Sequence, residues 1–177
     1  MVDVRKLAVC AMLTAMGVVL GGALSIPGLT QGAYTFKISL GMLPVILSGV
    51  LYGPIYGGMV GGLVDLLQAL IFPKGPYMPW FTITGVLFGL IPGLFFARGQ
   101  KRDIFRLFAA VFTGQFVSSV LLNTAILVFM SLNSKAWTII ICERIITQSV
   151  MVPVFAAIIY GVLKLMDKTK LKLTDAE

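Results

Sequence analysis

The chain has 177 residues, of which 58% are apolar and 12% are charged, whereas a soluble domain has about half apolar and a quarter charged residues. A water-soluble fold of this composition would expose large apolar surfaces, so we exclude soluble enzymes and nucleic-acid-binding modules. The net charge of +7 then concerns orientation in a membrane, and we expect no nucleic-acid partner. We predict an all-α membrane protein.

Six apolar segments follow one another along the chain, each bounded by charge, by Gly and Pro, or by an interfacial Trp. The first follows Arg5 and Lys6 as a signal peptide would, but it is long and has no small-x-small cleavage site, so we predict a retained span. The segments cover residues 7–25, 38–52, 55–72, 80–97, 107–131 and 137–163. We expect residues 1–177 to form a single domain, a six-helix bundle.

The basic residues decide between five and six spans. With six spans and an inside N-terminus, the outside loops hold three basic residues and the cytoplasmic segments hold ten. This distribution obeys the positive-inside rule, so we predict six transmembrane helices with both termini in the cytoplasm. The outside residues are Lys37, Lys74 and Lys135, and the cytoplasmic ones are Arg5, Lys6, Arg98, Lys101, Arg102, Arg106, Lys164, Lys168, Lys170 and Lys172.

Small residues recur at four-residue spacing on two of these segments. Residues 57–62 contain two overlapping GxxxG patterns, and Ala11 and Ala15 form a small-xxx-small pair on the first segment. Such patterns let helix backbones approach closely, and packing inside the bundle is the simpler interpretation of both.

Polar side chains inside the apolar segments indicate a binding site, because a charge near the bilayer centre costs about 2.5–3.5 kcal/mol on insertion scales. At 1.5 Å per residue from the predicted outer ends, Asp65, Asn123 and Arg144 all lie about 10 Å below the outer surface. Three amides extend the set, namely Gln68 at i+3 from Asp65, Gln148 at i+4 from Arg144, and Gln115 two turns before Asn123 on roughly the same face. We predict a pocket that is open to the outside.

Aromatic and cationic residues lie in the predicted outer loops above this pocket. Lys37 precedes the second span, and Tyr77 and Trp80 precede the fourth. Aromatic rings beside amides and cations suit a flat heteroaromatic ligand with an acidic tail. Simpler roles are also open, since the aromatics can anchor the chain at the interface and Lys37 can be a solvated loop charge.

The charged residues within the spans also have a structural alternative. Asp65 can pair with Arg144 as a salt bridge inside the bundle without any ligand. Glu143 is adjacent to Arg144 and points about 100° away from it on a helix, so both cannot face the pocket fully. We assign Arg144 to the pocket and leave Glu143 as its helper or as a packing partner.

Motifs for catalysis, metal binding and nucleotide binding are not found in the sequence. The chain has no His, its two cysteines (Cys10 and Cys142) form no CxxC pattern, and neither HExxH nor GxxxxGK[ST] occurs. We therefore expect no catalytic residues, no metal and no cofactor, and the chain is not expected to be an enzyme. Uptake driven by ATP would require partner subunits.

Several stretches resemble the substrate-binding S components of energy-coupling factor (ECF) vitamin transporters, and among these the folate-specific members. The densest are 38–44 (ISLGMLP), 51–58 (LYGPIYGG) and 65–82, and 122–124 and 144–153 extend them. The resemblance implies a six-helix bundle in the cell membrane that binds one vitamin near its outer face. It also implies partners, namely a transmembrane coupling subunit that meets Ala11 and Ala15 and two ABC-type ATPases.

For the ligand, the resemblance implies folate. Asp65 and Asn123 would then read the donor-rich pterin edge, and Arg144 and Lys37 would receive the carboxylates. The folate-type pattern has Arg where this chain has Lys37, so pantothenate or a thiamine-like compound is an alternative. Two further hypotheses are a membrane scaffold that binds proteins but no small molecule, and an ion-coupled carrier that works without ATP.

Overall fold

The computed structural model describes residues 4–22, 26–27, 37–38, 40–72, 79–96, 103–129 and 137–168. Two-residue strands β1 (Ile26–Pro27) and β2 (Lys37–Ile38) pair antiparallel, and all other elements in this part of the chain are helical. The helices are α1 (Val4–Gly22), α2 (Met42–Tyr52), α3 (Pro54–Ile71), α4 (Pro79–Phe96), α5 (Ile104–Gln115), the π-helical segment η1 (Phe116–Leu122), α6 (Asn123–Phe129) and α7 (Trp137–Lys168).

Five helical stretches in the described part of the chain are long and apolar enough to cross a membrane. They are α1, α3, α4, residues 104–126 and residues 147–166. The predicted segment at 38–52 is shorter than expected, because α2 has only 11 residues and extends about 17 Å, against a hydrocarbon core of about 30 Å. The all-helical architecture is as predicted, and the count of six spans stays a prediction.

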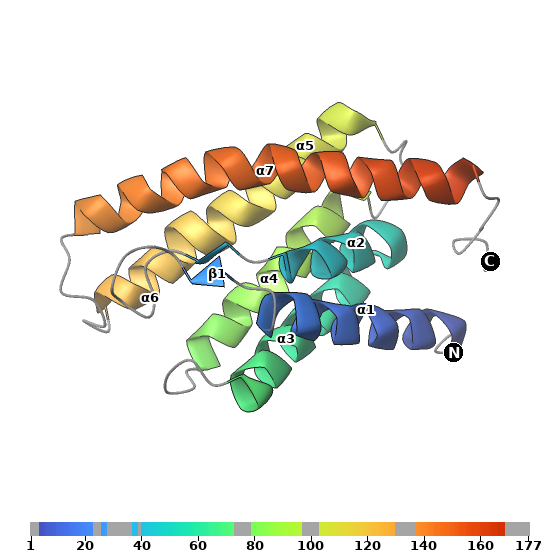
Figure 1. Cartoon of the computed structure of the whole chain (residues 1–177), viewed down its shortest axis with the longest axis horizontal. Coiled ribbons are helices and arrows are strands. Elements are labelled where there is room, and N and C mark those ends of the chain that lie inside the picture. The colour runs from blue at the N-terminus through green and yellow to red at the C-terminus, as the bar shows by residue number, and fades with distance from the viewer. Residues whose placement is uncertain are drawn as a thin grey trace.

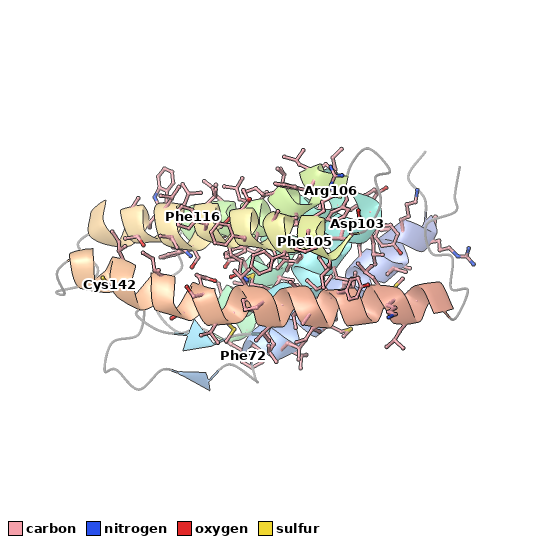
Figure 2. The ribbon with its side chains drawn as sticks, turned by 90° about the horizontal axis from the view of Figure 1, so that it is seen from above. Phe72, Asp103, Phe105, Arg106, Phe116 and Cys142 are labelled. Atoms are coloured by element: carbon pink, nitrogen blue, oxygen red, sulfur yellow. The ribbon has the colours of Figure 1, made fainter. Side chains whose placement is uncertain are left out.

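The helices form two groups that lie side by side (Figure 1). In the first group α3 packs along α4, and α1 and α2 pack against α3. In the second group α7 runs alongside α5, η1 and α6 (Figure 2). The first turns of α1 and α5 and the last turn of α7 lie at one end of the molecule, which we call the Arg106 end, and α7 begins at the opposite end, which we call the Cys142 end.

The larger apolar cluster lies toward the Arg106 end and joins α2, α4, α5 and α7. Its fully buried members include Ile46, Leu107 and Ile159, one from each of three helices. Arg106 Nε donates a hydrogen bond to Phe95 O at 3.0 Å, which ties α5 to α4 at the same end. A smaller cluster joins the four helices α1, α2, α3 and α4. It consists of Val45 and its neighbours Cys10, Val60, Val64 and Phe88.

Large apolar side chains are also exposed on the outward faces of the helices. Phe105 is 86% exposed and Ile55 73%, and Phe108, Phe112 and Phe116 stack in sequence along α5 and into η1. In water such surfaces would associate, whereas in lipid they need no cover. The exposed faces therefore suit a bundle surrounded by lipid.

Glycines form the contact between α3 and α4. This confirms the prediction that the GxxxG pattern of α3 serves helix packing. Gly57 and Gly61 of α3 face Gly89 and Gly85 of α4, and a Cβ atom added at Gly57 or Gly89 would overlap the facing backbone carbonyl. Since no side chain separates the helices, their backbones are in direct contact. This contact fixes the position of the residue that follows one turn later on α3, Asp65.

Candidate functional site

Asp65 is brought against α4 by the glycine contact. A Cβ atom added at Gly85 would lie 3.0 Å from Asp65 Cβ. One turn before Gly85, Thr82 Oγ1 donates a hydrogen bond to Asp65 Oδ2 at 2.9 Å. The Asp65 side chain is half-buried, and an ionised carboxylate has about four acceptor positions, so it can accept several hydrogen bonds at once.

Asn123 is the first residue of α6 and joins the second group of helices to α4. Thr84 Oγ1 lies 3.1 Å from Asn123 Oδ1 and 2.7 Å from Phe81 O of its own helix, and its single hydroxyl proton is shared between these two acceptors. Thr84 is buried. Because residues two apart on a helix point about 200° from each other, Thr82 and Thr84 place polar contacts on opposite faces of α4, one toward α3 and one toward α6.

Gln68 takes a different position from the one that its spacing to Asp65 predicts. Its Nε2 donates a hydrogen bond to Gly17 O of α1 at 3.2 Å. The amide also packs on Gly21, where an added Cβ atom would overlap it. Gln68 therefore links α1 to α3 and is available to a ligand only through the rest of its amide.

On α7, Arg144 and Gln148 are one turn apart, so both start from the same face of the helix. Gln148 is half-buried, and its Oε1 atom is buried without a hydrogen-bond partner among the described residues. The side chains of Lys37, Tyr77 and Arg144 lie outside the part of the chain whose side chains the structure describes. Both the pocket role of Arg144 and its salt bridge with Asp65 therefore stay predictions.

Two other predicted features are exposed. Trp80 stands on the first turn of α4 and is 55% exposed, which is the position of an interfacial anchor. Ala11 and Ala15 are exposed on one face of α1. Small, exposed side chains at this spacing allow the backbone of another helix to approach α1 closely. The two alanines lie outside the buried face of α1, which includes Gly17 and Gly21.

Sequence reasoning missed the two threonines of α4 that hold Asp65 and Asn123. Hydroxyls in helices commonly bond a carbonyl of their own helix, as Thr14 does with Cys10 O at 2.8 Å, so Thr82 and Thr84 gave no separate signal. One signal was present: α4 repeats glycine at positions 85, 89 and 93, which matches the glycine spacing of α3. Pairing these two patterns would have placed Thr82 beside Asp65.

Comparison with known proteins identifies the family. The family model described as ECF transporter, substrate-specific component, matches residues 5–163. A relative from Clostridium novyi (strain NT), named "Folate transporter FolT", is 33% identical over 135 residues, which are 76% of this chain and 77% of the relative. The chain belongs to the family of ECF transporter substrate-specific components, and the predicted resemblance is confirmed.

A solved structure gives the same architecture. The crystal structure of FolT bound with folic acid aligns with a TM-score of 0.76 at 24% identity and covers 89% of this chain and 93% of that chain. Membership in this transporter family, together with five candidate spans in the described part of the chain, makes this chain a multi-pass membrane protein. Its family consists of transporter subunits that bind substrate, not of enzymes.

Proposed function

We propose that this chain is the folate-binding subunit of an ECF importer in the cell membrane. The main support is the match to a relative named as a folate transporter over about three quarters of both chains. The proposal includes one domain over residues 1–177, six membrane-spanning helices, and the Cys142 end facing outside with both termini in the cytoplasm. The common position of the first turn of α1 and the last turn of α7 supports placing both termini on the same side of the membrane (Figure 1).

The proposed pocket lies between α3, α4, α6 and α7. Asp65 and Asn123 offer acceptor oxygens to the donor-rich edge of a pterin ring, with Thr82 and Thr84 fixing their positions. Arg144 and Lys37 receive the two carboxylates of the ligand, Arg144 as a planar fork and Lys37 as a point charge. Gln148, Tyr77 and Trp80 complete the proposed lining, and Gln68 takes part from its place against α1.

The proposed partners are a transmembrane coupling subunit and two ABC-type ATPases. Ala11 and Ala15 would meet the coupling subunit, which their exposure on α1 supports. The hydrogen bond from Gln68 to Gly17 O would then connect the buried face of the same helix, α1, to the pocket side of α3, since Gln68 lies one turn from Asp65.

Titration calorimetry of the detergent-purified chain with folic acid tests the proposal. Wild-type protein should bind folic acid but neither pantothenate nor thiamine. Arg144→Ala and Asp65→Asn should each weaken binding about 10- to 100-fold, because hydrogen bonds to charged groups contribute about 1.5–3 kcal/mol. Lys164→Ala on α7 and Asp103→Asn before α5 are the matched controls, as both residues are exposed at the Arg106 end, and both should bind as wild type.

Other outcomes would identify an alternative. Binding of pantothenate or thiamine in place of folic acid would keep the importer and replace the ligand. Folded protein that binds none of the three would favour the scaffold hypothesis.

A further inference from the structure

Four buried polar atoms in the second group of helices make no hydrogen bond to any described residue. They are Gln115 Nε2, Ser118 Oγ, Thr124 Oγ1 and Gln148 Oε1. Gln115 is 3% exposed and Ser118 is fully buried. Such atoms are rare in native proteins and lower stability unless a ligand or water satisfies them, most of all inside a membrane, where bulk water is absent.

Two of these atoms mark the level at which the apolar packing of α5 against α7 ends. Leu107 and Val111 of α5 and Val152 of α7 belong to one apolar cluster. One turn beyond Val111 comes Gln115, and one turn before Val152 comes Gln148. Because α5 and α7 run in opposite directions (Figure 2), both amides lie on the side of the cluster that faces the Cys142 end.

The two amides carry complementary atoms that do not meet. Gln115 Nε2 is a donor and Gln148 Oε1 is an acceptor, yet neither has a hydrogen-bond partner among the described residues. Direct contact would satisfy both at once, and without it both atoms need a third group with its own acceptor and donor.

The backbone also changes at this level. The π-helical segment η1 starts directly after Gln115 and runs for seven residues, whereas π turns are rare and are found mainly at functional sites. Ser118, Ser119 and Val120 of this segment are buried in succession. Ser118 follows Gln115 by three residues, so these two buried polar side chains lie within one helical turn of each other, at the point where the winding changes.

We infer that Gln115 and Ser118, together with Gln148, form the polar floor of the ligand cavity. Gln115 Nε2 donates to a ring nitrogen or ring carbonyl oxygen of the ligand. Ser118 Oγ and Gln148 Oε1 accept from a ring N–H or an exocyclic amine. The matching ligand group is a planar heterocycle with donors and acceptors on one edge. This inference rests on the proposed folate function and adds two residues that set the specificity of the same cavity.

A pair of serine variants provides the test. Ser118 and Ser48 are both fully buried, but Ser48 Oγ donates to Val45 O at 2.7 Å, whereas Ser118 Oγ has no partner. Ser118→Ala should weaken folic acid binding about three- to tenfold, the value of one neutral hydrogen bond. Without ligand, its thermal unfolding midpoint should equal or exceed that of wild type, because an unsatisfied buried hydroxyl is removed. Ser48→Ala should bind folic acid as wild type does.

Gln115→Leu extends the test to the donor, and it should also weaken binding while leaving the midpoint of the ligand-free protein unchanged or higher. If the yield of folded Gln115→Leu is poor, Ser118→Ala decides. Unchanged binding in Ser118→Ala would overturn the inference, as water would then satisfy these atoms, and leave the folate function standing. An equal loss in Ser48→Ala would overturn it too. Wild-type protein that does not bind folic acid would overturn the proposed function and this inference with it.

Discussion

The contacts inside the first group of helices differ in kind from the contacts inside the second group. Between α3 and α4, the backbones touch where Gly57 meets Gly89 and Gly61 meets Gly85, and no side chain lies between them at these points. Between α5 and α7, large apolar side chains fill the Arg106 end, and beyond them are buried polar atoms without a hydrogen-bond partner among the described residues. The first contact is made by backbone atoms, whereas the second has unused hydrogen-bonding capacity.

This difference separates a rigid support from an adaptable wall. Backbone contacts hold α3 and α4 at a short distance, so we expect Asp65 and Thr82 to keep their geometry when a ligand binds. The second group of helices carries the buried polar atoms that have no hydrogen-bond partner among the described residues. We expect substitutions in the first group to change stability, and substitutions around η1 to change ligand binding.

The largest expected effect comes from Gly89→Ala. The added Cβ atom overlaps the Gly57 carbonyl, and overpacking against backbone should lower the free energy of unfolding by about 3 kcal/mol. Gly161→Ala on α7 is the control, because nothing lies within 4 Å of its added Cβ. Replacing that helical glycine should raise stability by up to about 1 kcal/mol. Unfolding in mixed detergent micelles measures both, and equal effects would remove the distinction between the two groups.

Gly53→Ala separates backbone strain from steric contact. Gly53 joins α2 to α3 with φ +91° and ψ 179°, a region that only glycine adopts easily, while its added Cβ meets nothing within 4 Å. The cost should be about 2 kcal/mol and come from conformation alone. The same unfolding assay measures it. A neutral result would show that this link can relax, and that contact alone holds the first group.

Thr82→Val has the smallest expected effect. It removes the hydrogen bond to Asp65, and bonds between membrane helices contribute on average about 0.6 kcal/mol and at most about 1.7 kcal/mol. Thr14→Val is the matched control, since Thr14 bonds only within its own helix. A loss in unfolding free energy well above that range would mean that the hydrogen bond, and not the glycine contact, positions α3 on α4.

Much of the fold could be predicted from the apolar segments. The predicted spans at 55–72 and 80–97 differ from α3 and α4 by one residue at each end. The helical segment predicted at 38–52 was too long, because hydropathy counts Ile38 and Leu40 as apolar regardless of their backbone conformation. In the structure Ile38 pairs in a strand and Leu40 lies in a turn.

The sequence could point only to those residues of the candidate site that are charged or carry an amide, because such side chains are unusual within a membrane span. That signal led to Asp65, Asn123 and Gln148, but it could not show that Gln68 bonds to α1. The π-helical segment could not be predicted from the sequence, because its residues are ordinary apolar and hydroxyl residues. Whether Ser118 bonds its own helix or stays unsatisfied depends on backbone winding, which a hydropathy pattern does not encode.

The lengths of the helices also determine how the bundle fits a bilayer. α7 has 32 residues and α3 has 18, so they extend about 48 Å and about 27 Å respectively. The apolar part of α7, residues 147–166, extends only about 30 Å, so both helices nearly match a hydrocarbon core of about 30 Å and the remaining turns of α7 extend beyond that core. A bilayer thinner than the apolar stretches is accommodated by tilting, at fractions of a kcal/mol per Å. The subunit should thus tilt little in a bilayer of ordinary thickness and more in a thinner one.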